Sequence, residues 1–228
     1  MKRISFFILF SLLLNNAVVS QSNPQMGGWY MYFFSKSFKD SPFGFQGDLQ
    51  YRNMNIAGDL QQNMLRGGLT FKPKDWSAKF ILGYASISSP NSTEDGLKFE
   101  NRIYQEVLIP NKIAPRVYLT HRFRYEQRLI ENVDMRTRFR YNLFMNIALN
   151  NTEIVKNTVY LALYNEVFVN GERHIGSNYT VNYFDRNRLY TAIGYALNKD
   201  MKFQLGIMNQ YANSGGKNQI QLSFHHNF

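Results

Sequence analysis

Apolar and polar residues alternate one for one along much of the chain. The alternation is most regular in residues 116–129, 135–147, 202–211 and 219–228. Successive side chains of a β-strand point to opposite faces of its sheet, so this two-residue period predicts strands with one apolar and one polar face. Seven more segments share this character with more interruptions: 27–34, 44–52, 61–71, 76–86, 98–109, 158–168 and 182–197.

Short clusters of turn-forming residues separate several of these segments. They lie at 39–42, 72–75, 198–200 and 213–216 and contain Asp, Asn, Pro and Gly. Since no linker or change of composition interrupts residues 21–228, we expect one all-β domain. The pattern counts eleven strands, but single-chain bacterial barrels have even numbers. We therefore expect an antiparallel up-and-down barrel of about 10–12 strands, with ten or twelve preferred over eleven.

The first twenty residues have the features of a secretory signal peptide. Two basic residues precede an apolar run over residues 4–14, and Val18 and Ser20 are small enough for the −3 and −1 positions of a cleavage site. The alternative is a membrane anchor, which needs about 18 apolar residues, more than this run supplies. We expect cleavage after Ser20 and export of residues 21–228 in a Gram-negative bacterium.

Three features favour a transmembrane barrel in the outer membrane over a soluble sheet. Several predicted strands are 12 residues or longer, whereas soluble strands have about 5–6 residues and membrane strands need about 9–11. The last strand carries Phe224 and ends on Phe228, which resembles the signal read by the barrel-assembly machinery. Aromatic residues stand near the ends of the apolar stripes, as interfacial girdles do: Tyr51, Phe71, Tyr84, Tyr195, Tyr211 and Phe228.

Connection lengths indicate an orientation for such a barrel. If Phe228 lies on the periplasmic side, the short connections 72–75 and 198–200 lie there too. The longer connections 86–97 and 170–178 then fall on the outer side, as in known outer-membrane barrels.

Composition removes several classes of function. The chain has no cysteine, which excludes disulfides, thiolate metal sites and a lipid-anchored lipoprotein. Its net charge is +10, but export and inward-facing arginines argue against a nucleic-acid partner. No HExxH, P-loop, GxSxG or EF-hand motif is present, so we expect no metal site and no cofactor.

The polar face of the strands is strongly basic. By strand phase, the interior receives thirteen cations: Arg52, Arg66, Lys79, Arg102, Arg122, Arg124, Arg128, Arg136, Arg138, Arg140, Arg186, Arg188 and Lys202. Four acids share this face, Asp48, Glu106, Glu126 and Glu166, which leaves a surplus of nine positive charges. The candidate functional cluster is Arg102, Glu106, Arg122, Arg124, Glu126, Arg128, Arg136, Arg138, Arg140, Glu166, Arg186 and Arg188.

Two interpretations of this cluster stay open. Bidentate arginine–carboxylate pairs can form a network that fills and supports a narrow barrel. Alternatively, the uncompensated charge makes the interior attractive to small anionic solutes. In both cases the short connection 130–134 predicts an antiparallel hairpin with Arg122 and Arg124 beside Arg138 and Arg140.

Ser223 and His225 are the only catalytic candidates. They share one face of the last strand at positions i and i+2, about 7 Å apart, whereas a dyad needs contact at about 3 Å and an orienting acid. Their phase also points them into the interior and away from lipid. We therefore expect no enzymatic activity, with an outer-membrane enzyme acting on lipid or lipopolysaccharide as the alternative.

Several stretches resemble a family of uncharacterised bacterial outer-membrane-type proteins, known only as a domain of unknown function. They are residues 101–106 (NRIYQE), 121–128 (HRFRYEQR), 138–141 (RFRY), 164–168 (YNEVF) and 184–190 (FDRNRLY). The resemblance covers most of residues 21–228, is strongest over 98–228, and implies a barrel without an established activity.

The sequence thus predicts a non-enzymatic outer-membrane barrel with an arginine-rich polar lumen. It serves either as a structural protein or as a narrow channel or binder for small anionic solutes, with outer-membrane lipid and the barrel-assembly machinery as partners. A soluble periplasmic β-sandwich or lipocalin-like binder is a further alternative.

Overall fold

All eleven alternating segments form strands in the computed structural model, which describes residues 26–91, 95–131, 133–175 and 180–228. The strands are β1 (Gly27–Ser37), β2 (Phe43–Asn53), β3 (Leu60–Phe71), β4 (Lys79–Pro90), β5 (Leu97–Ala114), β6 (Val117–Ile130), β7 (Arg136–Ala148), β8 (Thr158–Asn170), β9 (Phe184–Ala196), β10 (Met201–Ala212) and β11 (Gly215–Asn227). Over the described ranges, no helix has the length and apolar character needed to cross a membrane. The predicted signal peptide, residues 1–20, lies outside the described residues.

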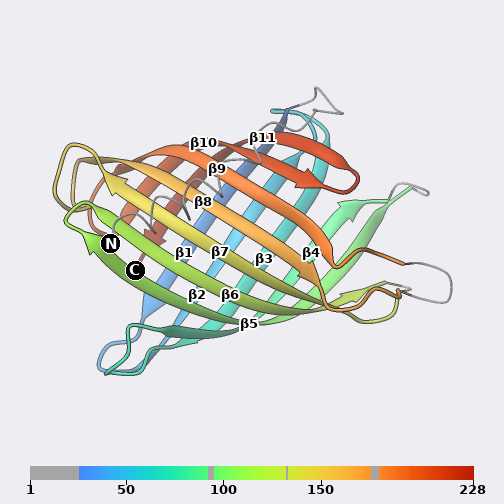
Figure 1. Cartoon of the computed structure of the whole chain (residues 1–228), viewed down its shortest axis with the longest axis horizontal. Coiled ribbons are helices and arrows are strands. Elements are labelled where there is room, and N and C mark those ends of the chain that lie inside the picture. Colours follow the sequence, from blue (N-terminus) through green and yellow to red (C-terminus); the bar gives the residue numbers. More distant parts are fainter. Residues whose placement is uncertain (1–25, 92–94, 132, 176–179) are drawn as a thin grey trace, which may run out of the picture.

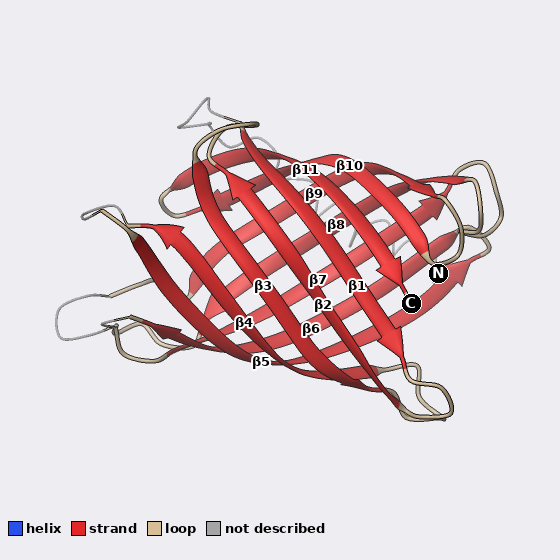
Figure 2. Cartoon of the chain, turned by 180° about the vertical axis from the view of Figure 1, so that it is seen from behind, coloured by secondary structure: helices blue, strands red, loops and turns tan. Residues whose placement is uncertain are grey.

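The strands close into one barrel in the order of the chain (Figure 1). Each strand pairs antiparallel with the next, and the tilted strands wrap around the long axis of the barrel (Figure 2). Closure joins β1 to β11 in parallel, with Trp29 opposite Gln221. The eleven strands confirm the expected range of about 10–12, whereas the preference for ten or twelve over eleven was wrong. An even number is required only if the first and last strands are antiparallel, and this pairing cannot be seen in the alternation.

The barrel wall has an apolar outer face and a largely polar inner face. Leu69 and Leu82 project outward with 60% of each residue exposed, while Glu126 on the inner face is only 1% exposed. Because the closed wall turns alternate residues to opposite sides, one two-residue pattern produces both surfaces. The phase predicted for β6 and β7 agrees with the structure, since Arg124 of β6 and Arg140 of β7 both lie within ion-pair distance of Glu126 inside the barrel.

The interior is not polar throughout. Trp29 of β1 packs across the interior with Tyr160, Tyr190 and Met208, which come from β8, β9 and β10. Phe33, also on the inner face of β1, stacks on His225 with ring centres 4.7 Å apart. Since β1 carries large apolar side chains on both faces, its alternation is weak, which explains why this strand was less regular in the sequence.

Candidate functional site

An arginine–carboxylate network fills much of the interior, and its centre is the β6–β7 hairpin. In the antiparallel register, Arg124 lies opposite Arg140 and Glu126 lies opposite Arg138. The hairpin therefore brings arginines from neighbouring strands together on the inner face, as the short connection predicts. Like charges this close repel unless carboxylates or bound anions lie between them.

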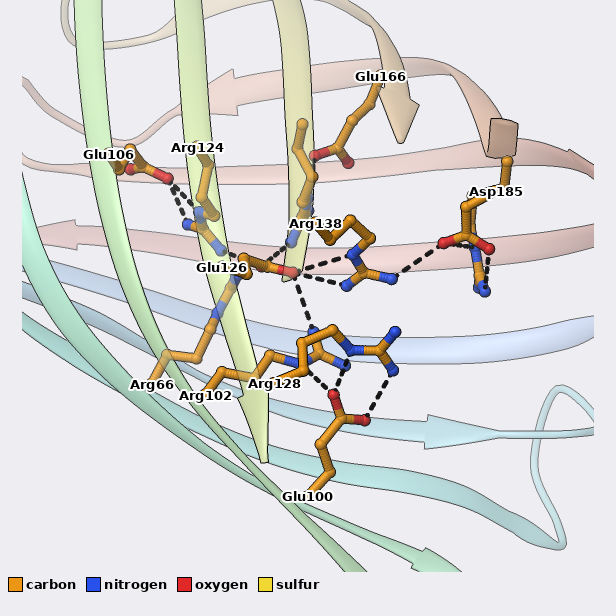
Figure 3. A network of polar contacts seen from close by, with 12 residues as sticks. Arg66, Glu100, Arg102, Glu106, Arg124, Glu126, Arg128, Arg138, Glu166 and Asp185 are labelled. Atoms are coloured by element: carbon orange, nitrogen blue, oxygen red, sulfur yellow. Dashed lines mark hydrogen bonds and ion pairs between the residues drawn. The ribbon is translucent and has the colours of Figure 1, made fainter. Parts of the chain in front are cut away.

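Glu126 is the hub of this network (Figure 3). Its carboxylate accepts hydrogen bonds from Arg138 Nη2 at 2.7 Å and Arg140 Nη1 at 2.6 Å. Arg124 and Arg102 lie further away, with nitrogen–oxygen distances of 3.5 and 3.7 Å. One buried carboxylate thus compensates parts of four guanidinium charges that come from three strands.

Two further carboxylates extend the network around the barrel. Glu106 of β5 accepts from Arg124 at 2.5 Å. Glu166 of β8 accepts from Arg140 at 2.6 Å and from Arg122 at 2.7 Å. Consecutive strands from β5 to β8 are therefore linked by charge-assisted hydrogen bonds in addition to their backbone pairing.

The structure adds two acids that the sequence reasoning missed. Glu100 accepts from Arg102 at 2.7 Å and from Arg128 at 2.6 Å. Asp185 accepts from Arg138 at 3.0 Å and pairs with Arg186 at 3.1 Å. With these two acids, the predicted surplus of nine positive charges falls to seven.

Different signals would have revealed the two acids. Glu100 lies within the predicted segment 98–109 and shares the phase of Arg102, so the alternation alone would have placed it on the inner face. Asp185 has the opposite phase from Arg186. The β8–β9 register shifts beside Phe168 and Val169, so that Arg186 pairs with Phe168 and Phe184 with Val169. Asp185 is the extra residue of this bulge, and a bulge re-aims a side chain without leaving a periodic signal.

Aromatic rings form part of the same network. Phe168, 1% exposed, has the guanidinium carbons of four arginines over its ring, at 4.5–5.9 Å from the ring centre. These arginines are Arg138, Arg140, Arg186 and Arg188. Tyr104 lies against Arg124 in the same way, at 4.4 Å. Such cation–π contacts stabilise guanidinium groups that are withdrawn from water.

Several interior cations have no carboxylate partner. Among the described residues, no acid lies within ion-pair distance of Arg52, Lys79, Arg136 or Lys202. Arg66, by contrast, donates to Asp48 at 2.7 Å. Some interior cations are thus paired with carboxylates, while others among the described residues are not. The described part of the chain also holds no cluster of acidic and histidine side chains suited to a metal ion.

The family model "Protein of unknown function (DUF2490)" matches residues 26–221. The chain belongs to this family. This match confirms the predicted membership of an uncharacterised family. It covers nearly the whole barrel of this DUF2490 protein, from β1 into β11. No curated protein matches the chain.

The Ser223–His225 pair of this DUF2490 barrel is closer than predicted. Ser223 Oγ lies 3.1 Å from His225 Nε2. The expected separation of about 7 Å describes backbone spacing along one strand, and the long imidazole side chain closes the gap. Ser223 is buried, and His225 has no hydrogen bond to a carboxylate within the described residues. The pair therefore lacks the orienting acid of a nucleophilic dyad.

The two phenylalanines of the predicted assembly signal lie on the outer face. Phe224 stacks against Phe203 of β10, with ring centres 4.6 Å apart. Phe228 is 60% exposed, and its backbone N–H donates to the Ser35 carbonyl at 2.8 Å. The last residue of the DUF2490 chain is thus held by β1 through its backbone and presents its ring outward.

Proposed function

We propose that this protein is a non-enzymatic outer-membrane β-barrel that binds small anions in its arginine-rich interior. The observation that carries the proposal is the inversion of the two surfaces. Large apolar side chains such as Leu69, Leu82 and Leu205 cover the outside, while the charged network lies inside. A lipocalin-like binder or a soluble sandwich has the opposite arrangement, with its apolar residues enclosed and its charges in water.

A lipid environment accounts for the outer surface. Soluble monomers rarely expose contiguous apolar patches larger than a few hundred Å², yet outward leucines and aromatics here extend over consecutive strands. Lipid also accounts for the orientation of the arginines. An arginine facing the middle of a bilayer costs about 2–4 kcal/mol, so only the inner face can hold this many. The proposal includes export by the signal peptide at residues 1–20 and insertion by the barrel-assembly machinery.

The interior charge supports anion binding. Thirteen cations and six carboxylates on one enclosed surface leave seven positive charges to be compensated by anions or water. Most of the network is buried, and Glu126 is only 1% exposed. We therefore favour a narrow, largely filled interior that holds anions over a wide aqueous pore.

A purely structural barrel is the second candidate, and the hub at Glu126 is the observation that favours it. A carboxylate shared by four arginines stiffens the wall whether or not a solute enters. In this alternative the remaining cations are neutralised by water and diffuse counter-ions only.

The proposal is tested in two steps. The full-length protein should fractionate with outer membranes, begin at Gln21 and migrate differently on gels with and without boiling, as closed barrels do. Recovery in the soluble periplasmic fraction would contradict the membrane assignment. The purified barrel should then show a preference for anions in planar bilayers, or saturable anion binding in detergent. If the barrel shows neither conductance nor anion binding, only the structural candidate remains.

A further inference from the structure

Arg52 is a buried cation held only by neutral groups. It is 8% exposed, and its Nε and Nη2 groups donate to Gln50 Oε1 at 3.0 and 2.5 Å. Its Nη1 group donates to Gln62 Oε1 at 2.8 Å. A guanidinium has five N–H groups, so two remain without an acceptor among the described residues. A buried charge without an opposite charge is costly.

The nearest acid is already occupied. Asp48 pairs with Arg66 at 2.7 Å and also accepts from Gln50 Nε2 at 2.6 Å. The Gln50 amide therefore lies between this carboxylate and Arg52, so Arg52 contacts the neutral amide oxygen and not the negative charge. Arg66, Arg102 and Arg188 repel Arg52, and Asp48 is the acid that attracts it.

Arg188 is the second poorly compensated cation in this region. Its Nε donates to Gln210 Oε1 at 2.9 Å. Its nearest carboxylate oxygen, Glu166 Oε2, lies 4.0 Å away, and the other oxygen of Glu166 is engaged by Arg122 and Arg140. Within the described residues, the Nη groups of Arg188 make no hydrogen bond.

Both guanidiniums lie against the ring of Trp29. The guanidinium carbon of Arg52 is 3.8 Å from the ring centre, and that of Arg188 is 5.0 Å from it. Arg52 comes from β2, directly opposite Trp29 in the register, whereas Arg188 reaches the ring from β9. The indole is itself fixed, since its Nε1 donates to Gln61 Oε1 at 3.3 Å. One ring thus gathers two cations from different parts of the wall.

We propose that Arg52, Arg188 and Trp29 form a subsite for a compact tetrahedral dianion, phosphate or sulfate. This subsite rests on the anion-binding function proposed above and gives it a place and a ligand class. Two guanidiniums supply the two positive charges that a dianion needs, and their N–H forks match the oxygens of such an anion. Trp29 and Arg52 lie near the beginning of β1 and the end of β2, at the end of the barrel opposite Phe228.

The sequence supplies a direct probe. Trp29 and Trp76 are the only tryptophans of the chain, and Trp76 lies in the β3–β4 connection, 61% exposed. In the variant Trp76→Phe, fluorescence reports on Trp29 alone. Titration of this barrel in detergent with sodium phosphate, at ionic strength held constant with sodium chloride, should give a saturable change in emission. It should also raise the melting temperature, since a ligand that binds only the folded state stabilises it.

Variants locate the binding. In the Trp76→Phe background, Arg52→Gln and Arg188→Gln should each weaken the apparent phosphate affinity at least tenfold. Lys112→Gln removes one positive charge from an exposed pair with Glu153 and should leave the affinity unchanged. Arg188→Lys keeps the charge but lacks the planar fork, so it should also weaken binding. If Arg52→Gln fails to fold into a heat-modifiable barrel, Arg188→Lys still tests whether phosphate binds at this subsite.

The possible results separate the subsite from the general function. Loss of the response in the Arg52 and Arg188 variants, but not in Lys112→Gln, supports the subsite. A phosphate response that survives both substitutions overturns it and moves binding to another part of the network. Absence of any phosphate or sulfate response at Trp29 also overturns it. In the first of these two cases phosphate still binds, so the proposed function stands without this subsite. In the second case the proposed function stands only if the same preparation prefers anions in bilayers, and fails if it does not.

Discussion

Glu126 and Arg138 face each other across the β6–β7 hairpin, with the Arg138 Nη2 atom 2.7 Å from a carboxylate oxygen. Neither side chain is significantly exposed. Arg138 also reaches Asp185 on β9 at 3.0 Å, so this cross-strand pair connects the hairpin to a strand two positions further along the wall. It is one of the contacts, with those of Glu106 and Glu166, that extend the local pairing into a network around the interior.

Replacing Glu126 with Gln should destabilise the barrel by about 3–5 kcal/mol, because it leaves buried guanidiniums without their shared counter-charge. Denaturant unfolding in lipid vesicles, followed by the shift between folded and unfolded gel bands, measures this. The control is Glu153→Gln. Glu153 pairs with Lys112 at 2.6 Å in an exposed position, where the effect should stay below about 1 kcal/mol. Equal effects at the two positions would show that burial of the network contributes nothing.

Replacing Arg138 and Arg140 together with Ser should reduce the preference for anions. The substitution removes two of the thirteen interior cations and the two shortest ion pairs of Glu126, which leaves its carboxylate with the more distant Arg102 and Arg124. Reversal potentials in bilayers with a salt gradient should therefore shift toward cation selectivity. An unchanged reversal potential in a conducting barrel would mean that permeating ions do not pass this hairpin.

Phe168→Leu should lower stability by about 1–3 kcal/mol, since the ring carries cation–π contacts to four buried arginines. Phe139→Leu is the matched control. Phe139 lies on the outer face of β7, 53% exposed, and a leucine there keeps that position apolar. A larger loss at Phe139 than at Phe168 would contradict the structural role given to the inner ring.

A charged residue in place of Phe228 should impair assembly far more than the same change at Asn227. Phe228 presents its ring on the apolar outer face, whereas the Asn227 side chain accepts a hydrogen bond from Ser35 Oγ at 2.6 Å. Pulse-chase measurement of heat-modifiable protein in outer membranes compares the two variants. Equal assembly rates would remove Phe228 from the proposed recognition signal.

The fold could be predicted because alternation is a local property. In β6 and β7 each step reverses the face, so the inward position of Arg124 and Arg138 follows from their spacing alone. The same reasoning could not place Asp185, because a bulge changes the phase within two residues. It also gave little information on β1, where Trp29 and Phe33 make the inner face as apolar as the outer one.

The site required distances that a pattern does not contain. Strand spacing placed Ser223 and His225 too far apart, because it ignores how far side chains lean along a strand. The grouping of Arg52 and Arg188 at Trp29 joins β2, β1 and β9, which approach one another only after closure. Likewise, the parallel pairing that makes the strand number odd becomes visible only when β1 meets β11.

This seam has a consequence for how the polypeptide can be handled. Since β1 and β11 run in the same direction, Gly27 and Asn227 stand at opposite rims of the barrel. A short peptide cannot join these positions without passing through or around the wall, so circular permutation by a short linker should fail. Epitope tags inserted beside the two residues would instead be presented at opposite rims. If the barrel spans the outer membrane as proposed, one intact-cell labelling experiment with both tags would read out its orientation.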